Sequence, residues 1–367
     1  MVAGHPGPPA MTRHELAGWL EATAHHLGLA AAASLPAYRT TAGEQAAWQA
    51  AWGAADNAGR LPWLERTLAA RLDPFAGRPW ARTVLVFAFP HLWDRPANLP
   101  DLPAPAAGAP AGRISRYACG PDYHLAARPL LAELHRRLET RLARPLRHEG
   151  GADAWPVPER FLAVRAGLGQ TGRNRMLQLA GGRGCRFFLG ALFVDAELPA
   201  GAWPTPADSA TAGAAPPPCA GCRRCLDACP TGALHDDVPL RLAACRSYLS
   251  MEYRGVLDAC QQGWLGDALF GCDACTAICP PALATPGQAV DLQWLLSVPA
   301  GDLRRRLHGT ALAHAGPTLL KRNAAAILAG HPGADARRLL VHAAAATGSA
   351  VVRDTIAIAL AHRRPEA

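Results

Sequence analysis

Hydrophobic and polar positions follow two different periods along the chain, and together they predict a mixed α+β fold. Behind a Thr cap, apolar residues at helical spacing predict a helix over 12–31, with further helices over roughly 60–72 and 124–142. Unbroken apolar runs at 83–89 (TVLVFAF) and 187–194 (FFLGALFV) predict buried strands. Because strands and helices alternate, we expect an N-terminal α/β or α+β domain.

Beyond residue 290 the pattern changes to Ala-, Leu- and Arg-rich segments broken by Gly and Pro. Two helical hairpins of this kind are typical of a short HEAT-like array, and a plain helical cap is equally compatible with the pattern. The predicted helices cover roughly residues 290–298, 300–313, 317–330, 334–346 and 349–362.

Composition shifts predict the domain boundaries. A stretch rich in Pro, Ala and Gly at 199–218 has the character of a linker. We therefore expect an N-terminal domain over 1–198, the linker over 199–218, a cysteine-rich module over 219–288 and a helical region over 289–367.

The overall composition excludes a disordered chain. Of the 367 residues, 50% are hydrophobic and 18% are charged, which is enough to bury a large core. Lys and Arg outnumber Asp and Glu by 37 to 29, and the net charge of +8 is compatible with a polyanionic partner. Residues 1–10 lack the features of an export signal, and no run of 18 apolar residues occurs. We expect a cytoplasmic monomer without a membrane span.

The cysteines are concentrated in one segment, because nine of the eleven lie between 219 and 279. In a cytoplasmic protein this favours metal or redox chemistry over disulfides. The first four, followed by Pro230, have the C-x2-C-x2-C-x3-C-P spacing of bacterial ferredoxins. A second set consists of Cys245 and a C-x2-C-x3-C-P run from Cys272 to Pro280.

Eight thiolates are enough for two [4Fe–4S] clusters. In two-cluster ferredoxins the Cys that precedes Pro ligates the other cluster, and this rule assigns the ligands here. Structural zinc is the alternative, but its paired C-x2-C motifs fit the triple spacing less well. Cys119, Cys185 and Cys260 are expected to be packing residues. The first cluster is assigned Cys219, Cys222, Cys225 and Cys279, and the second Cys229, Cys245, Cys272 and Cys275.

Several segments in the same order resemble the tRNA epoxyqueuosine reductase family over roughly 12–360. Besides the cysteine spacing, they include CRSYLSMEYRG around Cys245 and GCDACTAICP at 271–280. Upstream the similar segments are RISRYACGPDYH at 113–124, DAWPVPER at 153–160, AGLGQTGRN at 166–174 and FFLGALFVD at 187–195, and LKRN at 320–323 follows in the helical region.

The resemblance implies an N-terminal cobalamin-binding catalytic domain, a ferredoxin-like module with two clusters and C-terminal HEAT-like helices that bind tRNA. It also implies reduction of epoxyqueuosine to queuosine at the wobble position of tRNA, with electrons from an unidentified donor. The epoxide oxygen leaves as water, which takes up two electrons and two protons. A general acid is needed, and a carboxyl group with a raised pKa suits this role.

By position in the family pattern, Asp153 is the proton donor and a cobalamin contact. Asp122 is the second candidate for the acid, with Tyr123 and His124 as possible binding residues. Glu159 and Arg160 are as compatible with a structural ion pair as with a role in the pocket. The other implied cobalamin contacts are Leu177, Leu189, Gly190, His235, Asp273 and Ala274.

The tRNA should be held mainly through its phosphates. The residues implied for this contact are Tyr253, Lys321, Arg322, Arg337 and Arg338, with Arg353 and Arg304 to Arg306 as further candidates. We expect Asn323 to cap or brace a helix instead.

The chain departs from the family pattern at Gln170, Arg173 and Pro281. These departures leave open two alternatives, a reductase that acts on a small molecule and an electron carrier that reduces a partner protein's corrinoid. Salt-sensitive tRNA binding would distinguish a tRNA-modifying reductase from both of these alternatives.

Overall fold

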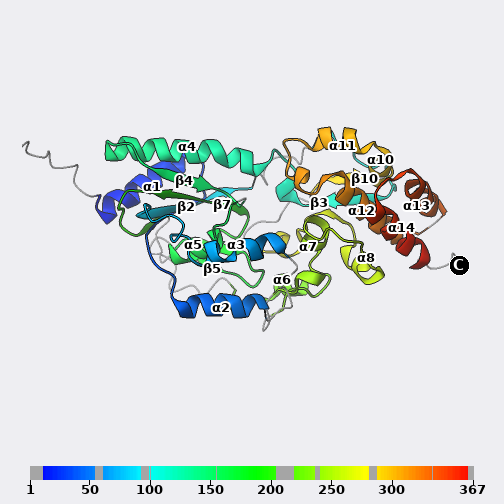
Figure 1. Ribbon diagram of the computed structural model, residues 1–367, viewed down its shortest axis with the longest axis horizontal. Helices are drawn as coiled ribbons and strands as arrows, with labels where there is room; N and C mark the ends of the chain where they lie inside the picture. The colour runs from blue at the N-terminus through cyan, green and yellow to red at the C-terminus, as the bar shows by residue number, and fades with distance from the viewer. Residues whose placement is uncertain are drawn as a thin grey trace, which may run out of the picture.

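The computed structural model describes residues 11–53, 61–91, 99, 101–153, 155–203, 219–235, 240–280, 287–332 and 334–362. The molecule is elongated, with a five-stranded sheet in one half and most of the C-terminal helices in the other (Figure 1). Among the described residues, no helix is both long enough and apolar enough to cross a bilayer.

The larger sheet has the order β4-β7-β2-β1-β8, and all of its neighbouring strands are antiparallel. The N-terminal half is therefore α+β and not a parallel α/β domain. Its strands are β1 (Ala31–Pro36), β2 (Thr83–Pro90), β4 (His148–Gly151), β7 (Phe187–Val194) and β8 (Gly201–Trp203).

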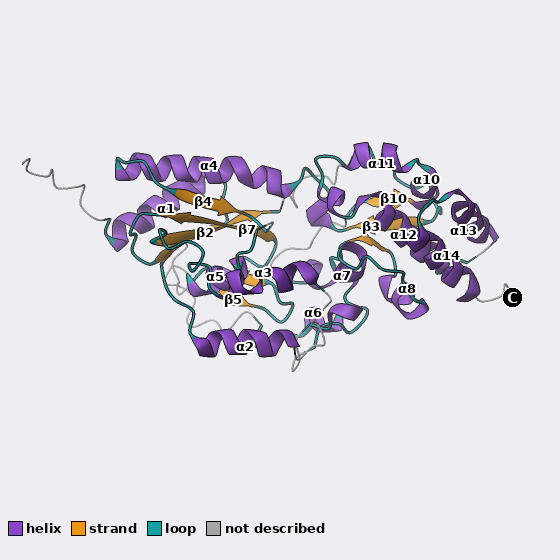
Figure 2. Ribbon diagram, viewed as in Figure 1, coloured by secondary structure: helices purple, strands orange, loops and turns teal. Residues whose placement is uncertain are grey.

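Helices cover both faces of this sheet (Figure 2). Along β2, Leu85 and Phe87 belong to the core on one face, whereas Val84 and Val86 belong to the core on the other. Burial on both faces explains why the strand is an unbroken apolar run and does not alternate with polar residues. The helices of this half are α1 (Arg13–Leu27), α2 (Ala42–Gly53), α3 (Pro62–Leu72), α4 (Tyr123–Leu142) and α5 (Glu159–Arg165).

The first predicted helix ends earlier than expected. Thr12 caps α1 as predicted, but the helix stops at Gly28, which has a φ of 64°. Glycine adopts this left-handed conformation without a steric penalty and commonly ends helices. The chain then enters β1, whose Ala-rich sequence gives little sign of a strand.

A second sheet joins distant parts of the chain. β3 (Ala111–Ile114) is its middle strand, flanked by β9 (Ala268–Phe270) and β10 (Ala289–Asp291). Ile114, Ala118 and Cys119 accordingly pack in the same core as the C-terminal helices. The structure thus departs from the sequential boundary predicted at 198, and β8 places residues 201–203 of the predicted linker in the larger sheet.

The C-terminal helices follow the predicted segments, except that the helix predicted over 300–313 ends at Leu307. Helix α12 is central, because ten of its residues are buried, and α10, α13 and α14 pack against it. The helices are α10 (Leu292–Ser297), α11 (Ala300–Leu307), α12 (Gly316–Ala329), α13 (Ala334–Ala346) and α14 (Ala350–His362). The remaining short elements are β5 (Gly169–Thr171), β6 (Leu177–Leu179), α6 (Arg224–Asp227), α7 (Arg246–Met251), α8 (Ala259–Leu265) and α9 (Ala274–Ala277).

Candidate functional site

The eight cysteines that the spacing singles out lie on short helices and turns between the two halves. Cys225 belongs to α6 and Cys275 to α9, while Cys245 caps the N-terminus of α7. Short helical turns place thiols three residues apart on one side of the loop, which is the arrangement that a compact metal cluster requires. None of the eleven cysteines forms a disulfide.

One group of thiols consists of Cys219, Cys222, Cys225 and Cys279. Burial raises the pKa of Cys225, and the charges of Cys219 and Cys222 raise it further. The pKa of Cys279 is raised by a hydrogen bond with Cys185 and by burial, and then by the charges of Cys219 and Cys225. Such influence requires proximity, so Cys279 lies near Cys219 and Cys225, although it follows Cys225 by 54 positions.

The other group consists of Cys229, Cys245, Cys272 and Cys275. Burial raises the pKa of Cys245, and the charge of Cys229 adds to the effect. Burial likewise raises the pKa values of Cys272 and Cys275, and both are raised further by the charge of Cys245. The charges of Cys185 and Cys225 also act on Cys275, so the thiols lie close together, and their division into two sets of four ligands stays a prediction.

A [4Fe–4S] cube makes different demands on its ligands than a single metal ion does. Among the described residues, no three His, Cys, Asp or Glu side chains converge on a point where one metal ion would be held. A [4Fe–4S] cube needs four thiolates spread around a larger body, with each ligand deprotonated. Clustered thiolates repel one another, and bound iron would relieve this repulsion because it is positively charged.

Cys185 is a ninth thiol beside the first group. Its side chain is 1% exposed, it accepts a hydrogen bond from the Asn174 amide at 3.4 Å, and it contacts Cys279. The sequence predicts a packing residue here, and the burial agrees with that. Its contact with a candidate ligand was not foreseen, because no motif connects residue 185 with residue 279.

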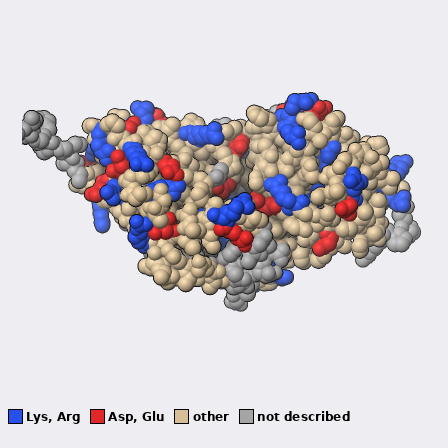
Figure 3. Space-filling model, in the orientation of Figure 1, with Lys and Arg blue, Asp and Glu red and all other residues tan. Residues whose placement is uncertain are grey.

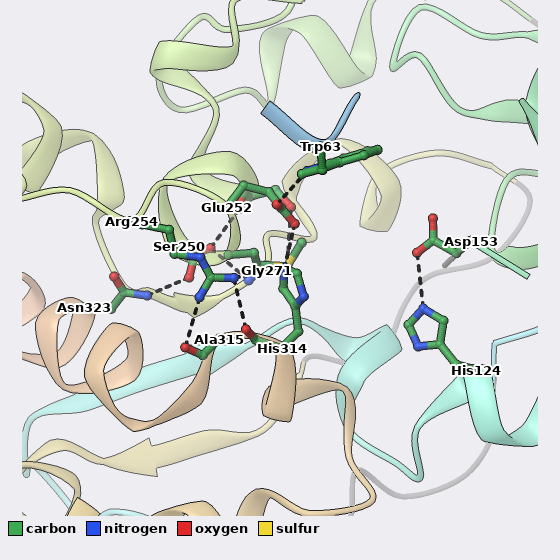
Figure 4. Close-up of polar contacts among 12 residues, drawn as sticks. Trp63, His124, Asp153, Ser250, Glu252, Arg254, Gly271, His314, Ala315 and Asn323 are labelled. Carbon is green, nitrogen blue, oxygen red and sulfur yellow. Dashed lines mark hydrogen bonds and ion pairs between the residues drawn. The ribbon is translucent and has the colours of Figure 1, made fainter. Parts of the chain in front are cut away.

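Asp153 lies just beyond strand β4, on a backbone with a φ of 58°. Its N–H donates a 2.9 Å hydrogen bond to Glu159 Oε1, which holds this uncommon conformation. The Tyr123 hydroxyl donates to Asp153 Oδ2, and Nε2 of His124 lies 3.7 Å from the same oxygen. Figure 4 shows the Asp153 carboxyl directed toward His124. The Asp153 side chain is still 67% exposed, so one side of the carboxyl remains open.

The pKa of Asp153 differs from the expectation for a proton donor. Desolvation by surrounding protein raises it, but hydrogen bonds with His124 and Tyr123 and the charges of His124 and Arg160 outweigh this effect. The pKa is therefore lowered, and the predicted raised value is wrong for this state of the protein. The hydrogen bond to Asp153 in turn raises the pKa of His124, and Asp122, 2.7 Å from His124 Nδ1, adds to the rise.

Glu159 is the carboxyl group whose pKa is raised near this site. Burial raises it, and the negative charge of Asp153 adds to the effect, so that the pKa is about 7. The Glu159 side chain is buried behind Asp153 and accepts the hydrogen bond from its backbone. It therefore supports the Asp153 loop and does not form the simple ion pair with Arg160 that was one of the two interpretations.

Stacked aromatic rings lie beside Asp153. Tyr123 stacks on Phe188 with ring centroids 4.0 Å apart and an interplanar angle of 7°, and His124 stacks on Tyr123. Phe188 belongs to β7 and Tyr123 to α4, so the sheet and the helix jointly position the Tyr123 hydroxyl. A hollow is visible between the two halves of the molecule in Figure 3.

A recess of about 510 Å³ adjoins Cys272. Among its lining residues are Ser115, Gly271, Cys272, Asp273 and Ala274. Asp273 is fixed there, because Ser115 Oγ donates to one carboxylate oxygen and the Arg116 N–H donates to the other at 2.8 Å. Ser115 lies within the RISRYACG segment but was not singled out, because nothing in the sequence pairs it with residue 273.

The other predicted cobalamin contacts are dispersed. Leu177 is only 2% exposed, and a side chain at Gly190 would meet the Phe87 ring at 2.4 Å, so both positions serve core packing. A side chain at either position is therefore not exposed to a ligand, and a cobalamin contact there through backbone groups stays a prediction. Leu189 is half-buried, and His235 is exposed, with its carbonyl accepting a 3.0 Å hydrogen bond from Arg175.

The predicted tRNA contacts divide into buried and exposed groups. Arg322 is fully buried, so its assignment to tRNA is wrong. Lys321 donates to the carbonyls of Leu296 and Val298 and is half-buried, and the Tyr253 hydroxyl donates to Val256 O at 3.1 Å. The exposed candidates are Arg304, Arg305, Arg306, Arg337, Arg338 and Arg353.

Two protein-family models match the chain. One, described as epoxyqueuosine reductase QueG, DUF1730, matches residues 71–154, which include Asp153. The other, a 4Fe-4S double cluster binding domain, matches residues 218–282, which include all eight cysteines. The chain therefore has a domain of the type that binds two iron–sulfur clusters. Pro281, one of the departures noted above, lies outside the described residues.

Curated relatives agree with the first of these matches. The epoxyqueuosine reductase of Pseudomonas aeruginosa is 38% identical over 167 residues, which are 46% of this chain and 43% of the relative. That of Xanthomonas campestris is 32% identical over 260 residues, 68% of this chain and 70% of the relative. The alignment thus spans less than half of the first relative and more than two thirds of the second.

Solved structures share the fold. An epoxyqueuosine reductase with an epoxyqueuosine-modified tRNA stem loop has a TM-score of 0.78 at 23% identity, covering 95% of this chain and 90% of that chain. The epoxyqueuosine reductase from Streptococcus thermophilus has a TM-score of 0.73 at 22% identity, with the same coverage. Since the Xanthomonas relative is similar over most of both lengths, the chain belongs to the epoxyqueuosine reductase family.

Proposed function

We propose that this chain reduces epoxyqueuosine to queuosine in the anticodon loop of tRNA, as its family name indicates. The observation that carries the proposal is the Asp153 carboxyl, held by Tyr123 and His124 yet 67% exposed. An epoxide that becomes an alkene loses its oxygen as water and takes up two electrons and two protons. The site must therefore supply protons beside a source of electrons.

The two thiol groups are the proposed electron path. Cys219, Cys222, Cys225 and Cys279 would hold one [4Fe–4S] cluster, and Cys229, Cys245, Cys272 and Cys275 the other. The proximity of Cys275 to Cys225 supports two adjoining clusters. Each cluster supplies one-electron transfer when it is bound, at a potential set by charge, hydrogen bonds and solvent exposure. Buried Cys185 would donate its proton toward the ligated Cys279 sulfur.

Cobalamin is the proposed cofactor between the clusters and the substrate. The fit rests on open space, since the recess next to Cys272 and the hollow between the two halves adjoin polar groups with fixed geometry. Asp273 and Ala274 would contact the corrinoid on the cluster side, and Asp153 and Leu189 on the side of the sheet. The cofactor supplies a strongly reducing cobalt centre, and the protein orients the reacting groups.

Asp153 is the proposed proton donor, with His124 as its source of protons. Between these two groups His124 holds a proton in preference to Asp153, because the pKa of His124 is raised and that of Asp153 is lowered. Bound substrate would exclude water from Asp153, which disfavours its charged form and raises its pKa. The proton then moves from His124 to Asp153 and on to the epoxide oxygen, while Tyr123 holds the carboxyl in place.

The C-terminal helices would bind the tRNA backbone. The proposed HEAT-like region presents Arg304, Arg305 and Arg306 on α11 and Arg337 and Arg338 on α13, all exposed. Figure 3 shows a group of basic side chains over α11. Phosphate contacts of this kind give affinity that falls with added salt.

The test is anaerobic reconstitution followed by metal analysis and turnover. Purified chain should bind roughly eight irons and one corrinoid. It should also convert epoxyqueuosine in a tRNA stem loop to queuosine, measured by mass spectrometry of the digested nucleosides. Zinc in place of iron, failure to bind cobalamin, or absence of turnover with full cofactor loading would overturn the proposal.

A matched pair of variants tests the ligand assignment. Cys279→Ala removes a proposed ligand, and we expect the iron content to fall to about four per chain. Cys185→Ala removes its buried neighbour, and the iron content should stay near eight. Equal losses in both variants, or a loss in Cys185→Ala alone, would contradict the assignment.

A further inference from the structure

The side chain of Trp63, near the start of α3, is 40% exposed. Among the described side chains it is the one aromatic residue in the group of exposed large hydrophobics. An exposed indole is not unusual in itself. What distinguishes Trp63 is that its surroundings fix it in place, as the next contacts show.

Trp63 is anchored through its indole nitrogen to the other half of the molecule. Nε1–H donates a 3.1 Å hydrogen bond to Glu252 Oε2, and the second carboxylate oxygen of Glu252 lies 2.9 Å from Nε2 of His314. Arg254 braces His314 by donating a 3.0 Å hydrogen bond to its carbonyl and a 3.2 Å one to that of Ala315. Figure 4 shows this network with Trp63 at its edge.

Arg71 fixes Trp63 from the N-terminal half. Its guanidinium carbon lies 5.3 Å from the centroid of the Trp63 ring, within the range of a cation–π interaction. The same guanidinium donates to the carbonyls of Val157 at 2.7 Å and Trp155 at 3.1 Å. The indole is therefore held by groups from both halves, and little rotational freedom would be lost when a ligand stacks on it.

Arg71 also connects Trp63 with the part of the chain that contains Asp153, the candidate proton donor. The Arg71 guanidinium contacts both the Trp63 ring and the carbonyls of Trp155 and Val157, which closely follow Asp153 in the chain. In Figure 4 the Trp63 ring extends toward the side on which Asp153 lies. Trp63 is thus connected through one side chain to the segment that follows the candidate acid.

We propose that Trp63 is a stacking platform for an unpaired base of the anticodon loop, next to the base that reacts at Asp153. Unpaired RNA bases stack on aromatic side chains, and each base has a π-face that accepts this contact without sequence readout. The positive charge of Arg71 beside the indole complements the RNA backbone. The inference rests on the proposed function, because it names how the same substrate is held.

The test measures binding of the reconstituted chain to an RNA stem loop with guanine at the wobble position, by fluorescence anisotropy of labelled RNA. Trp63→Leu keeps apolar volume but removes the π-face, and we expect Kd to rise about tenfold or more. Trp63→Phe keeps a ring without the indole N–H, and its Kd should stay near that of wild type. With epoxyqueuosine-containing stem loop, Trp63→Leu should raise KM more than it lowers kcat.

Trp80→Leu is the matched control. Trp80 also lies under an arginine, with the Arg147 guanidinium carbon 4.5 Å from the ring centroid. It precedes the end of β2 where Thr83 pairs with Val194, opposite the Phe187 end. Its replacement should leave Kd unchanged, and the Tm of each variant shows whether it is folded.

Two outcomes would overturn the stacking role while the proposed function stands. One is normal binding and turnover by Trp63→Leu. The other is equal loss in Trp63→Phe and Trp63→Leu, which would assign the effect to the hydrogen bond with Glu252. If the wild-type chain, fully loaded with cofactors, neither binds nor converts the stem loop, both proposals fail.

Discussion

Each half of the molecule has a hydrogen-bond network built around a charged side chain, and the two networks differ in how completely they are satisfied. In the C-terminal half, Arg322 is fully buried and donates to the carbonyls of Leu249, Tyr253 and Gly255 and to the side chain of Asn323. In the N-terminal half, Asp153 has its partners on one side and is open on the other. Both residues come from motifs that resemble the family pattern.

The difference separates a structural role for Arg322 from the chemical role proposed for Asp153. Arg322 connects α12 to the loop after α7, and Asn323 extends the brace by donating to the carbonyls of Ser250 and Leu269. No donor of this pair remains for a ligand. Asp153 keeps an accessible oxygen whose charge is balanced by His124. A motif residue is therefore a candidate for chemistry only when part of its bonding capacity is left unused.

The largest expected effect is that of Asp153→Asn on turnover. The amide keeps the size of the side chain but cannot deliver a proton, so kcat should fall by about 10²- to 10⁴-fold. The Tm should change little, because the side chain is 67% exposed. Asp122→Asn is the control, since Asp122 reaches His124 but not Asp153. If Asp122→Asn showed this loss of kcat and Asp153→Asn remained active, Asp122 would be the acid.

Arg322→Met should lower the stability and leave kcat unchanged, the reverse of what we expect for Asp153→Asn. It leaves several buried carbonyl oxygens without donors, each costing about 1–3 kcal/mol, and we expect a loss of roughly 3–5 kcal/mol in the free energy of unfolding. Denaturant titration measures this loss, and the folded fraction should retain its kcat. Lys321→Met is the neighbouring control and should cost less, because Lys321 is only half-buried. A stable Arg322→Met protein with weakened tRNA binding would return Arg322 to the interface.

The pH dependence of stability tests whether the pKa of Glu159 is raised. Its pKa rises from 4.5 to about 7 on folding, so its neutral form is the one favoured in the folded protein. The stability that this provides is complete below the unfolded value of 4.5 and is lost as pH rises through about 7. The wild type should lose about 3 kcal/mol over this range relative to Glu159→Gln, which does not titrate. Parallel stability curves for the two proteins would show that the pKa is not raised.

The smallest effect is expected for exposed arginines. Arg338 pairs with Asp335, but both side chains are about four-fifths exposed, at 79% and 82%. The double variant Arg337→Ser and Arg338→Ser should leave Tm unchanged, because surface ion pairs contribute about 0–1 kcal/mol. If these residues contact phosphates, the dependence of the binding constant on salt should become less steep by about one unit per lost contact. An unchanged salt dependence would exclude them from the interface.

Local sequence patterns predicted the regular elements well where the period was strong. The strand at 187–194 and the five C-terminal helices lie where the apolar pattern puts them. The double-cluster domain could also be predicted, because cluster ligands follow fixed short spacings. The strand at 31–36 was missed, since its Ala-rich sequence forms a strand only through pairing with β2 and β8.

Site residues were less predictable where burial decides their role. Arg322 was assigned to tRNA because basic residues are normally exposed, but it occurs in a helix that is apolar on nearly all sides, and this was a usable sign of burial. The lowered pKa of Asp153 depends on Tyr123 and His124, which are thirty residues away in the chain. Trp63 and Glu252 are 189 positions apart, so no local pattern could have paired them.

The middle position of β3 in the smaller sheet makes the iron–sulfur module inseparable from the rest of the chain. A fragment that begins at Cys219 would contain β9 and β10 but not the strand between them, leaving two unsatisfied backbone edges and a gap beside Leu269 and Val290. This module could therefore not be transferred to another protein as an independent domain unless residues 111–114 were transferred with it. The cysteine-rich segment and the upstream half of the chain thus form one folding unit.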